Sequence, residues 1–233
     1  MTYRNLVEKR KAYNLQIEGL INAADIVENE YDKGEYLEPW AKWHNRCPAQ
    51  ILLIGQDWGG QNYYLKNLGK DNDRNPTCKN LITLFEQMNI SIGAPTNPTT
   101  GVSVHFTNII PFLRKGQMQG GLDMILTQNL INEFAKEFTE PLIEIVNPQI
   151  IITLGMAAFR GIASIYNIAA DSKWKLKDMV EQGPVELNKN LFLFPMFHCG
   201  SSGVNRNRTL REQKGDWKKI VPYLRITDYD SSN

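Results

Sequence analysis

Several features that mark other protein classes are scarce or missing in this chain. It has no run of eighteen apolar residues, which argues against a transmembrane helix. Its first residues lack the apolar stretch of a signal peptide. Its three cysteines, Cys47, Cys78 and Cys199, lie far apart and form no C-x-x-C pair, so neither a disulfide framework nor a zinc ribbon is indicated. Together these absences predict a cytoplasmic protein.

Common motifs for nucleotides, metals and serine hydrolysis are missing as well. The segment Gly55–Gly60 follows an apolar run, but it is neither G-x-G-x-x-G nor a P-loop. No G-x-S-x-G surrounds Ser201 or Ser202, which disfavours a serine hydrolase. No His, Asp and Cys residues have the spacing of metal ligands, so we expect neither a metal nor another cofactor.

What is present suits one globular domain. The chain has 233 residues, of which 42% are hydrophobic and 22% charged. We therefore expect a single domain over residues 1–233. Apolar residues at helical spacing from Asn14 to Tyr31 predict a helical N-terminal segment over residues 1–46. The polar end, residues 227–233, is expected to be a flexible tail.

Four apolar, strand-like runs alternate with segments of helical spacing. Such alternation predicts an α/β fold, with three α/β/α layers around a central, four-stranded, mainly parallel sheet. The runs are Ile51–Ile54, Val102–Phe106, Ile150–Thr153 and Leu191–Phe194.

Each run is followed by a short polar or glycine-bearing segment, which we call its tip. In a parallel sheet, the tips of all strands lie at one edge. Ligands bind at that edge in open α/β sheets. Each tip also has a purely structural interpretation, because carboxylates and amides often shape turns and a lone histidine is more often structural. Their convergence is what predicts a site. The tips carry Gly55-Gln56-Asp57, Asn108, Gly155 and His198.

A short basic segment follows the last tip. Between His198 and Lys219 there are six Lys or Arg residues against two acidic ones, a local charge of +4 on a chain whose net charge is +1. Such a segment suits contact with a few phosphates. A solvated helix face is the alternative.

In this order, the segments resemble motifs of the uracil-DNA glycosylase superfamily, over roughly residues 50–222. The similar segments are Gly55-Gln56-Asp57, Pro76-Thr77-Cys78-Lys79-Asn80-Leu81, Phe106-Thr107-Asn108-Ile109-Ile110-Pro111, Ile151-Ile152-Thr153-Leu154-Gly155 and His198-Cys199-Gly200-Ser201.

The resemblance implies a monomeric hydrolase that flips uracil or a related damaged base out of DNA and excises it in base excision repair. It implies that Asp57 orients water and that His198 stabilises the leaving base. Base contacts are expected from Gly55, Gln56 and Asn108, and from Tyr63 or Tyr64 by stacking. DNA contacts are expected from Pro76, Thr77, Gly155, Ser201, Ser202, Val204, Arg206 and Arg208.

The chain also departs from the pattern of that superfamily. Trp58 stands where a proline is usual, Gly59 where some members have a tyrosine that excludes thymine, and Cys199-Gly200 where Pro-Ser is usual. Two alternatives therefore remain open. One is a non-catalytic binder of a modified base, nucleotide or DNA, and the other is a hydrolase that acts on free nucleosides.

Overall fold

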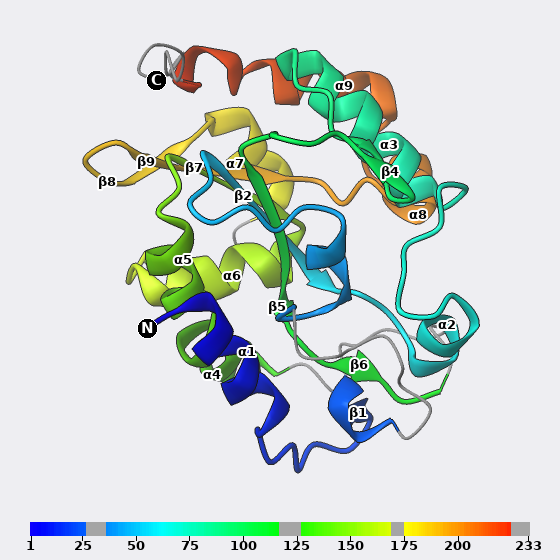
Figure 1. Cartoon of the computed structure of the whole chain (residues 1–233). Coiled ribbons are helices and arrows are strands. Elements are labelled where there is room, and N and C mark those ends of the chain that lie inside the picture. Colours follow the sequence, from blue (N-terminus) through cyan, green and yellow to red (C-terminus); the bar gives the residue numbers. More distant parts are fainter. Residues whose placement is uncertain (27–35, 117–126, 169–174, 225–233) are drawn as a thin grey trace, which may run out of the picture.

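A five-stranded sheet forms the centre of the protein (Figure 1). The computed structural model describes residues 1–26, 36–116, 127–168 and 175–224, so the tail predicted at 227–233 lies outside the described residues. The strand order is β5-β2-β7-β9-β8. The strands are β2 (Ile51–Asp57), β5 (Val104–Ile110), β7 (Ile150–Leu154), β8 (Val185–Asn188) and β9 (Leu191–Met196).

The four predicted runs form the parallel part of this sheet, which confirms the α/β class. β2 pairs in parallel with β5 and β7, and β7 pairs in parallel with β9. The predicted number of four strands is wrong, because β8 adds an antiparallel edge strand beside β9. β8 has only four residues of alternating partial and full exposure, so no apolar run marks it in the sequence.

Helices cover both faces of the sheet, because successive strand residues point to opposite sides. Leu52 and Ile54 belong to one hydrophobic cluster, which includes residues of α1, α4, α5 and α6. Ile51 and Leu53 belong to the other, which includes residues of α3 and α9. The helices are α1 (Tyr3–Lys11), α2 (Gln61–Lys66), α3 (Pro76–Phe85), α4 (Gln128–Phe134), the π-helix η5 (Ala135–Thr139), α5 (Glu140–Val146), α6 (Met156–Ile165), α7 (Leu176–Gln182), α8 (Ser201–Arg206) and α9 (Leu210–Lys218).

The N-terminal segment differs from its prediction. Its α-helix is α1, and the predicted helix from Asn14 is absent over the described residues 14–26; residues 27–31 lie outside the description. Instead, β1 (Leu20–Ile21) pairs antiparallel with β6 (Leu113–Arg114). This long-range pairing overrides the helical spacing of the apolar residues. The 3₁₀-helix η2 (Pro39–Lys42) then brings Glu38 and Trp40 into the interior, where both are buried.

The register of the sheet places the predicted tips side by side. Gly55 of β2 lies directly opposite Asn108 of β5, and Asp57 lies opposite Ile110. Asn108 therefore lies within its strand and not after it. β7 leads into Gly155, and β9 leads towards His198. The sheet thus brings all four tips to its carboxyl edge, where a pocket opens.

Candidate functional site

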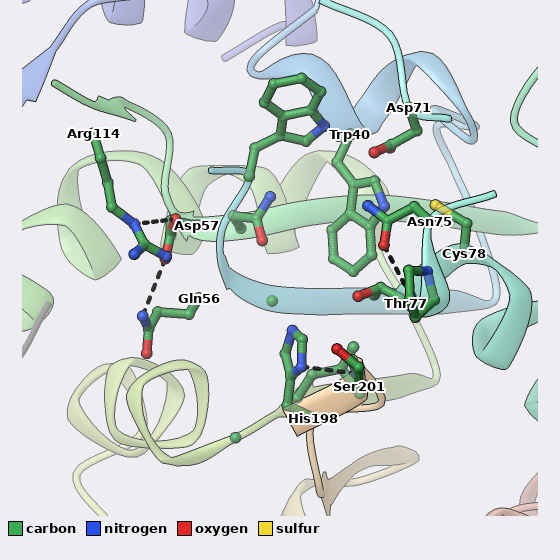
Figure 2. A pocket seen from close by; sticks show the side chains of 17 residues that line it. Trp40, Gln56, Asp57, Asp71, Asn75, Thr77, Cys78, Arg114, His198 and Ser201 are labelled. Atoms are coloured by element: carbon green, nitrogen blue, oxygen red, sulfur yellow. Dashed lines mark hydrogen bonds and ion pairs between the residues drawn. The ribbon is translucent and has the colours of Figure 1, made fainter. Parts of the chain in front are cut away.

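The pocket at this edge has a volume of about 450 Å³. In Figure 2, Gln56, Asp57 and Arg114 are grouped on one side, and Asp71, Asn75 and Thr77 on the other. The structure places nine of the predicted site residues on the pocket wall. These are Gly55, Gln56, Asp57, Pro76, Thr77, Asn108, Gly155, His198 and Ser201.

Asp57 is held by two neighbours and is only 2% exposed. Its Oδ1 accepts a hydrogen bond from Arg114 Nε at 2.8 Å, and its Oδ2 accepts from Arg114 Nη2 at 3.0 Å. Gln56 Nε2 also donates to Oδ2, at 3.0 Å. A carboxylate offers about four acceptor directions, so three are used and one remains at Oδ1. Asp57 can therefore orient a water molecule or a ligand N–H without losing Arg114.

His198 points into the pocket with a defined tautomer (Figure 2). Its Nδ1 accepts the backbone N–H of Gly200 at 3.0 Å, so the neutral ring carries its proton on Nε2. Although the ring is exposed to the open pocket, the surrounding protein lowers its pKa by desolvation, and the charge of Asp57 opposes that shift. His198 is thus a neutral donor at neutral pH.

The Cys199-Gly200 departure supports this orientation of His198. A Cβ atom at Gly200 would lie 2.8 Å from His198 Cε1 and 3.0 Å from Thr77 Oγ1, so a side chain there would displace the ring. Cys199 is buried, and its carbonyl oxygen accepts from Asn80 Nδ2 of α3 at 2.7 Å. The turn is therefore tied to α3, which also provides Pro76 and Thr77.

Asn108 and Trp40 share the space above Gly55. A Cβ atom at Gly55 would overlap with Asn108 Oδ1 and lie 2.8 Å from Trp40 Cζ3. The Asn108 amide nitrogen donates to Glu38 Oε2 at 2.9 Å. The strand register makes Asn108 and Gly55 predictable neighbours. Trp40 and Glu38 were missed, because nothing near residue 38 marks it as adjacent to β5.

The predicted stacking tyrosines are in the wrong place. Tyr64 is only 1% exposed and packs against Trp58, with ring centroids 5.7 Å apart, so no base can reach it. Tyr63 is half-buried, its hydroxyl accepts from Asn75 Nδ2 at 3.3 Å, and it does not line the pocket. Trp40 and Trp58 provide the aromatic wall instead.

Asp71 adds an acidic group beside Trp58. Its burial raises its pKa to about 7, an effect that the nearby Trp58 indole partly offsets. Within the described residues, neither Asp71 Oδ2 nor Trp58 Nε1 has a hydrogen-bond partner. Both atoms are buried, and the indole and the carboxyl group lie close enough to influence each other. No pattern in the sequence marks Asp71, because it lies in a polar segment with several other Asp and Asn residues.

Two arginines of the basic segment, Arg206 and Arg208, have different surroundings. Arg206 is exposed at the end of α8, and Val204 of the same helix is half-buried. Arg208 is committed to Asp216, with Nη2 and Oδ1 2.8 Å apart, and lies over the Phe197 ring. The structure therefore gives Arg208 a role in a structural ion pair that the sequence did not predict. The side chain of Ser202 lies outside the described part of the structure.

Across residues 1–26, 36–116, 127–168 and 175–224, no three His, Cys, Asp or Glu side chains are arranged to hold a metal ion. In the same ranges, none of the helices has both the length and the apolar character needed to cross a bilayer.

The chain matches no protein-family model and no curated protein.

Proposed function

We propose that the protein is a monomeric DNA N-glycosylase that excises uracil or a related damaged base in base excision repair. The observation that carries the proposal is the meeting of Asn108, Asp57 and His198 in one pocket, each from a different strand end. An amide, a carboxylate and a neutral imidazole donor are the groups that base recognition and cleavage of the glycosidic bond require. The resemblance to the uracil-DNA glycosylase superfamily, in fold and motifs, is part of this proposal.

In the proposed reaction, the flipped base enters beside Trp40 and its edge contacts Asn108. The bond between sugar C1′ and the base nitrogen breaks, and its electron pair moves onto the base. His198 Nε2–H donates to the base carbonyl oxygen where negative charge develops. The carboxylate of Asp57 stabilises the positive sugar and orients the water that adds to C1′. That water then releases a proton to solvent.

DNA contacts are proposed at the rim of the pocket. Pro76 and Thr77 begin α3 there, and Gly155 and Ser201 lie on the same wall. Arg206 adds an exposed positive charge, and Val204 is proposed as the wedge that fills the vacated base stack. These contacts explain a basic segment on a chain that is otherwise nearly neutral.

The test is base release from labelled oligonucleotides that contain uracil, thymine opposite guanine, hypoxanthine or xanthine, as single and double strands. We expect His198→Ala to lower kcat by about 10²–10³-fold, which is typical for loss of one such donor. We expect Asp57→Asn to lower turnover by orders of magnitude and to leave DNA binding largely intact. Asp178→Asn is the matched control, because Asp178 is exposed on α7. Full activity in both His198→Ala and Asp57→Asn would show that these two residues are not the catalytic groups.

A non-catalytic binder is the second candidate, and one observation favours it. The ion pair with Arg114 already compensates the charge of Asp57, which weakens the stabilisation that this carboxylate could give to a positive sugar. A binder would retain modified DNA in the same assay without releasing any base. Release from free nucleosides without DNA would instead favour a nucleoside hydrolase.

A further inference from the structure

A buried carboxylate lies directly behind the base-reading amide. Glu38 is 2% exposed and caps η2. Its Oε2 accepts two hydrogen bonds at once, from the backbone N–H of Trp40 at 2.9 Å and from Asn108 Nδ2 at 2.9 Å. One oxygen atom therefore holds both the aromatic wall and the amide of the pocket.

This arrangement gives the Asn108 amide a single orientation. A carboxamide has one donor end and one acceptor end, and rotation by 180° exchanges them. Rotation would bring Asn108 Oδ1 against Glu38 Oε2, two acceptors without a proton between them. When Glu38 carries its proton on Oε1, Oε2 still accepts both N–H groups. The observed orientation is therefore compatible with both charge states.

The orientation decides which end of the amide faces the pocket. Glu38 is not among the described residues that line the pocket, whereas Gly55, beneath Asn108 Oδ1, is. The donor end is thus turned back towards Glu38 and the acceptor end is presented over Gly55. An acceptor there favours a base that offers a ring N–H, as uracil does at N3, over a base with a ring-nitrogen lone pair at that position, as in cytosine.

We propose that Glu38 is a positioning residue that fixes the orientation of the Asn108 amide and so selects the base edge that the pocket accepts. This inference rests on the proposed function for its link to base excision. The link between Glu38 and Asn108 can nevertheless be tested in the protein alone.

The first test is solvent exchange of the Asn108 side-chain amide, measured by NMR in the ¹⁵N-labelled full chain and assigned with Asn108→Ala. We expect Glu38→Met, which fills the space but accepts no hydrogen bond, to speed exchange about tenfold or more, as loss of one bond implies. Glu38→Gln should retain slow exchange, because the Trp40 N–H keeps its carbonyl oxygen in the place of Oε2. Glu38→Ala is the second variant if methionine prevents folding.

The matched control is Glu186→Ala, on the exposed side of β8. Exchange of the Asn108 amide should not change in this variant. Unchanged exchange in Glu38→Met and in Glu38→Ala would overturn the proposal, whatever the activity of the protein.

The second test is a double-mutant cycle on release of uracil relative to cytosine. We expect Glu38→Met to lower kcat/KM for uracil about tenfold and to narrow the preference over cytosine, with Glu38→Gln close to the natural protein. In an Asn108→Ala background, Glu38→Met should have a much smaller effect, limited to loss of the hydrogen bond from the Trp40 N–H. Additive losses would show that Glu38 acts independently of Asn108 and would reject the positioning role. If the natural protein releases no base, the proposed function fails while the exchange measurement still decides the role of Glu38.

Discussion

Gly55 is the residue with the least room for change in the pocket. A methyl group there would meet Asn108 Oδ1 and the Trp40 ring. The Asn108 amide cannot move away without loss of the buried hydrogen bond that its nitrogen donates to Glu38. At this position, backbone geometry and the proposed base recognition depend on the same few atoms.

We therefore expect Gly55→Ala to lower the free energy of unfolding by about 1–3 kcal/mol, as over-packing does in a dense interior. Base binding should fall more than stability, because the reading amide is displaced. Chemical denaturation and oligonucleotide binding measure the two effects. Gly215→Ala in α9 is the control: no atom lies within 4 Å of a Cβ there, so that variant should gain about 0.5–1 kcal/mol. Equal stability of the two variants would contradict the crowding at Gly55.

At the scale of elements, α8 carries the proposed DNA contact, and α9 takes part in a structural ion pair. Arg206 is exposed on α8, whereas Arg208 leads into α9 and is paired with Asp216. Arg206→Ala should weaken DNA binding and reduce the slope of log K against log salt by about 1. Arg208→Ala should lower the melting temperature and leave that slope unchanged. An unchanged salt slope in Arg206→Ala would place α8 outside the interface.

The sequence predicts the elements that consist of continuous apolar runs. β2, β5, β7 and β9 are such runs, so their parallel pairing and their shared polar edge follow from simple rules. The antiparallel edge strand β8 does not follow, because it is short and half exposed. β1 is equally invisible, since only its pairing with β6 makes it a strand.

The candidate site was predictable to the same extent. Residues at strand ends, such as Asp57 and Asn108, meet because the sheet register requires it. Arg114 reaches the pocket, and Glu38 contacts Asn108 behind it, through tertiary contacts that no local pattern encodes. The sequence also does not show whether a tryptophan or a tyrosine ring faces the pocket. That depends on which rings are buried in the core, and only the tertiary packing determines it.

At the scale of the whole molecule, buried titratable groups set how stability depends on pH. Burial raises the pKa of Glu38 from 4.5 to about 8, and that of Asp71 from 3.8 to about 7. Between these values the folded state keeps protons that the unfolded chain has lost, so stability falls as pH rises. Burial lowers the pKa of His105 from 6.5 to about 4, which has the opposite effect, but only below pH 6.5.

We therefore expect the free energy of unfolding to fall between pH 6.5 and 8, by at most about 1.4 kcal/mol per pH unit for each carboxyl group. Glu38→Gln should flatten this slope, because it removes one of the two groups and keeps the hydrogen bonds to Trp40 and Asn108. Urea unfolding at several pH values measures the effect. Parallel curves for the natural protein and Glu38→Gln would show that Glu38 does not ionise in this range.

The N-terminal segment has a consequence for how the chain can be divided. The recognisable motifs begin near residue 50, yet Glu38 and Trp40 precede them. Leu6 and Val7 of α1 are fully buried in the core. β1 pairs with β6, the strand that carries Arg114. A shortened fragment cut at residue 50 would keep Asp57, Asn108 and His198 but not the groups that shape the space between them. Such a fragment would be a poor surrogate in any screen for ligands, because motif boundaries and the boundaries of the working pocket do not coincide.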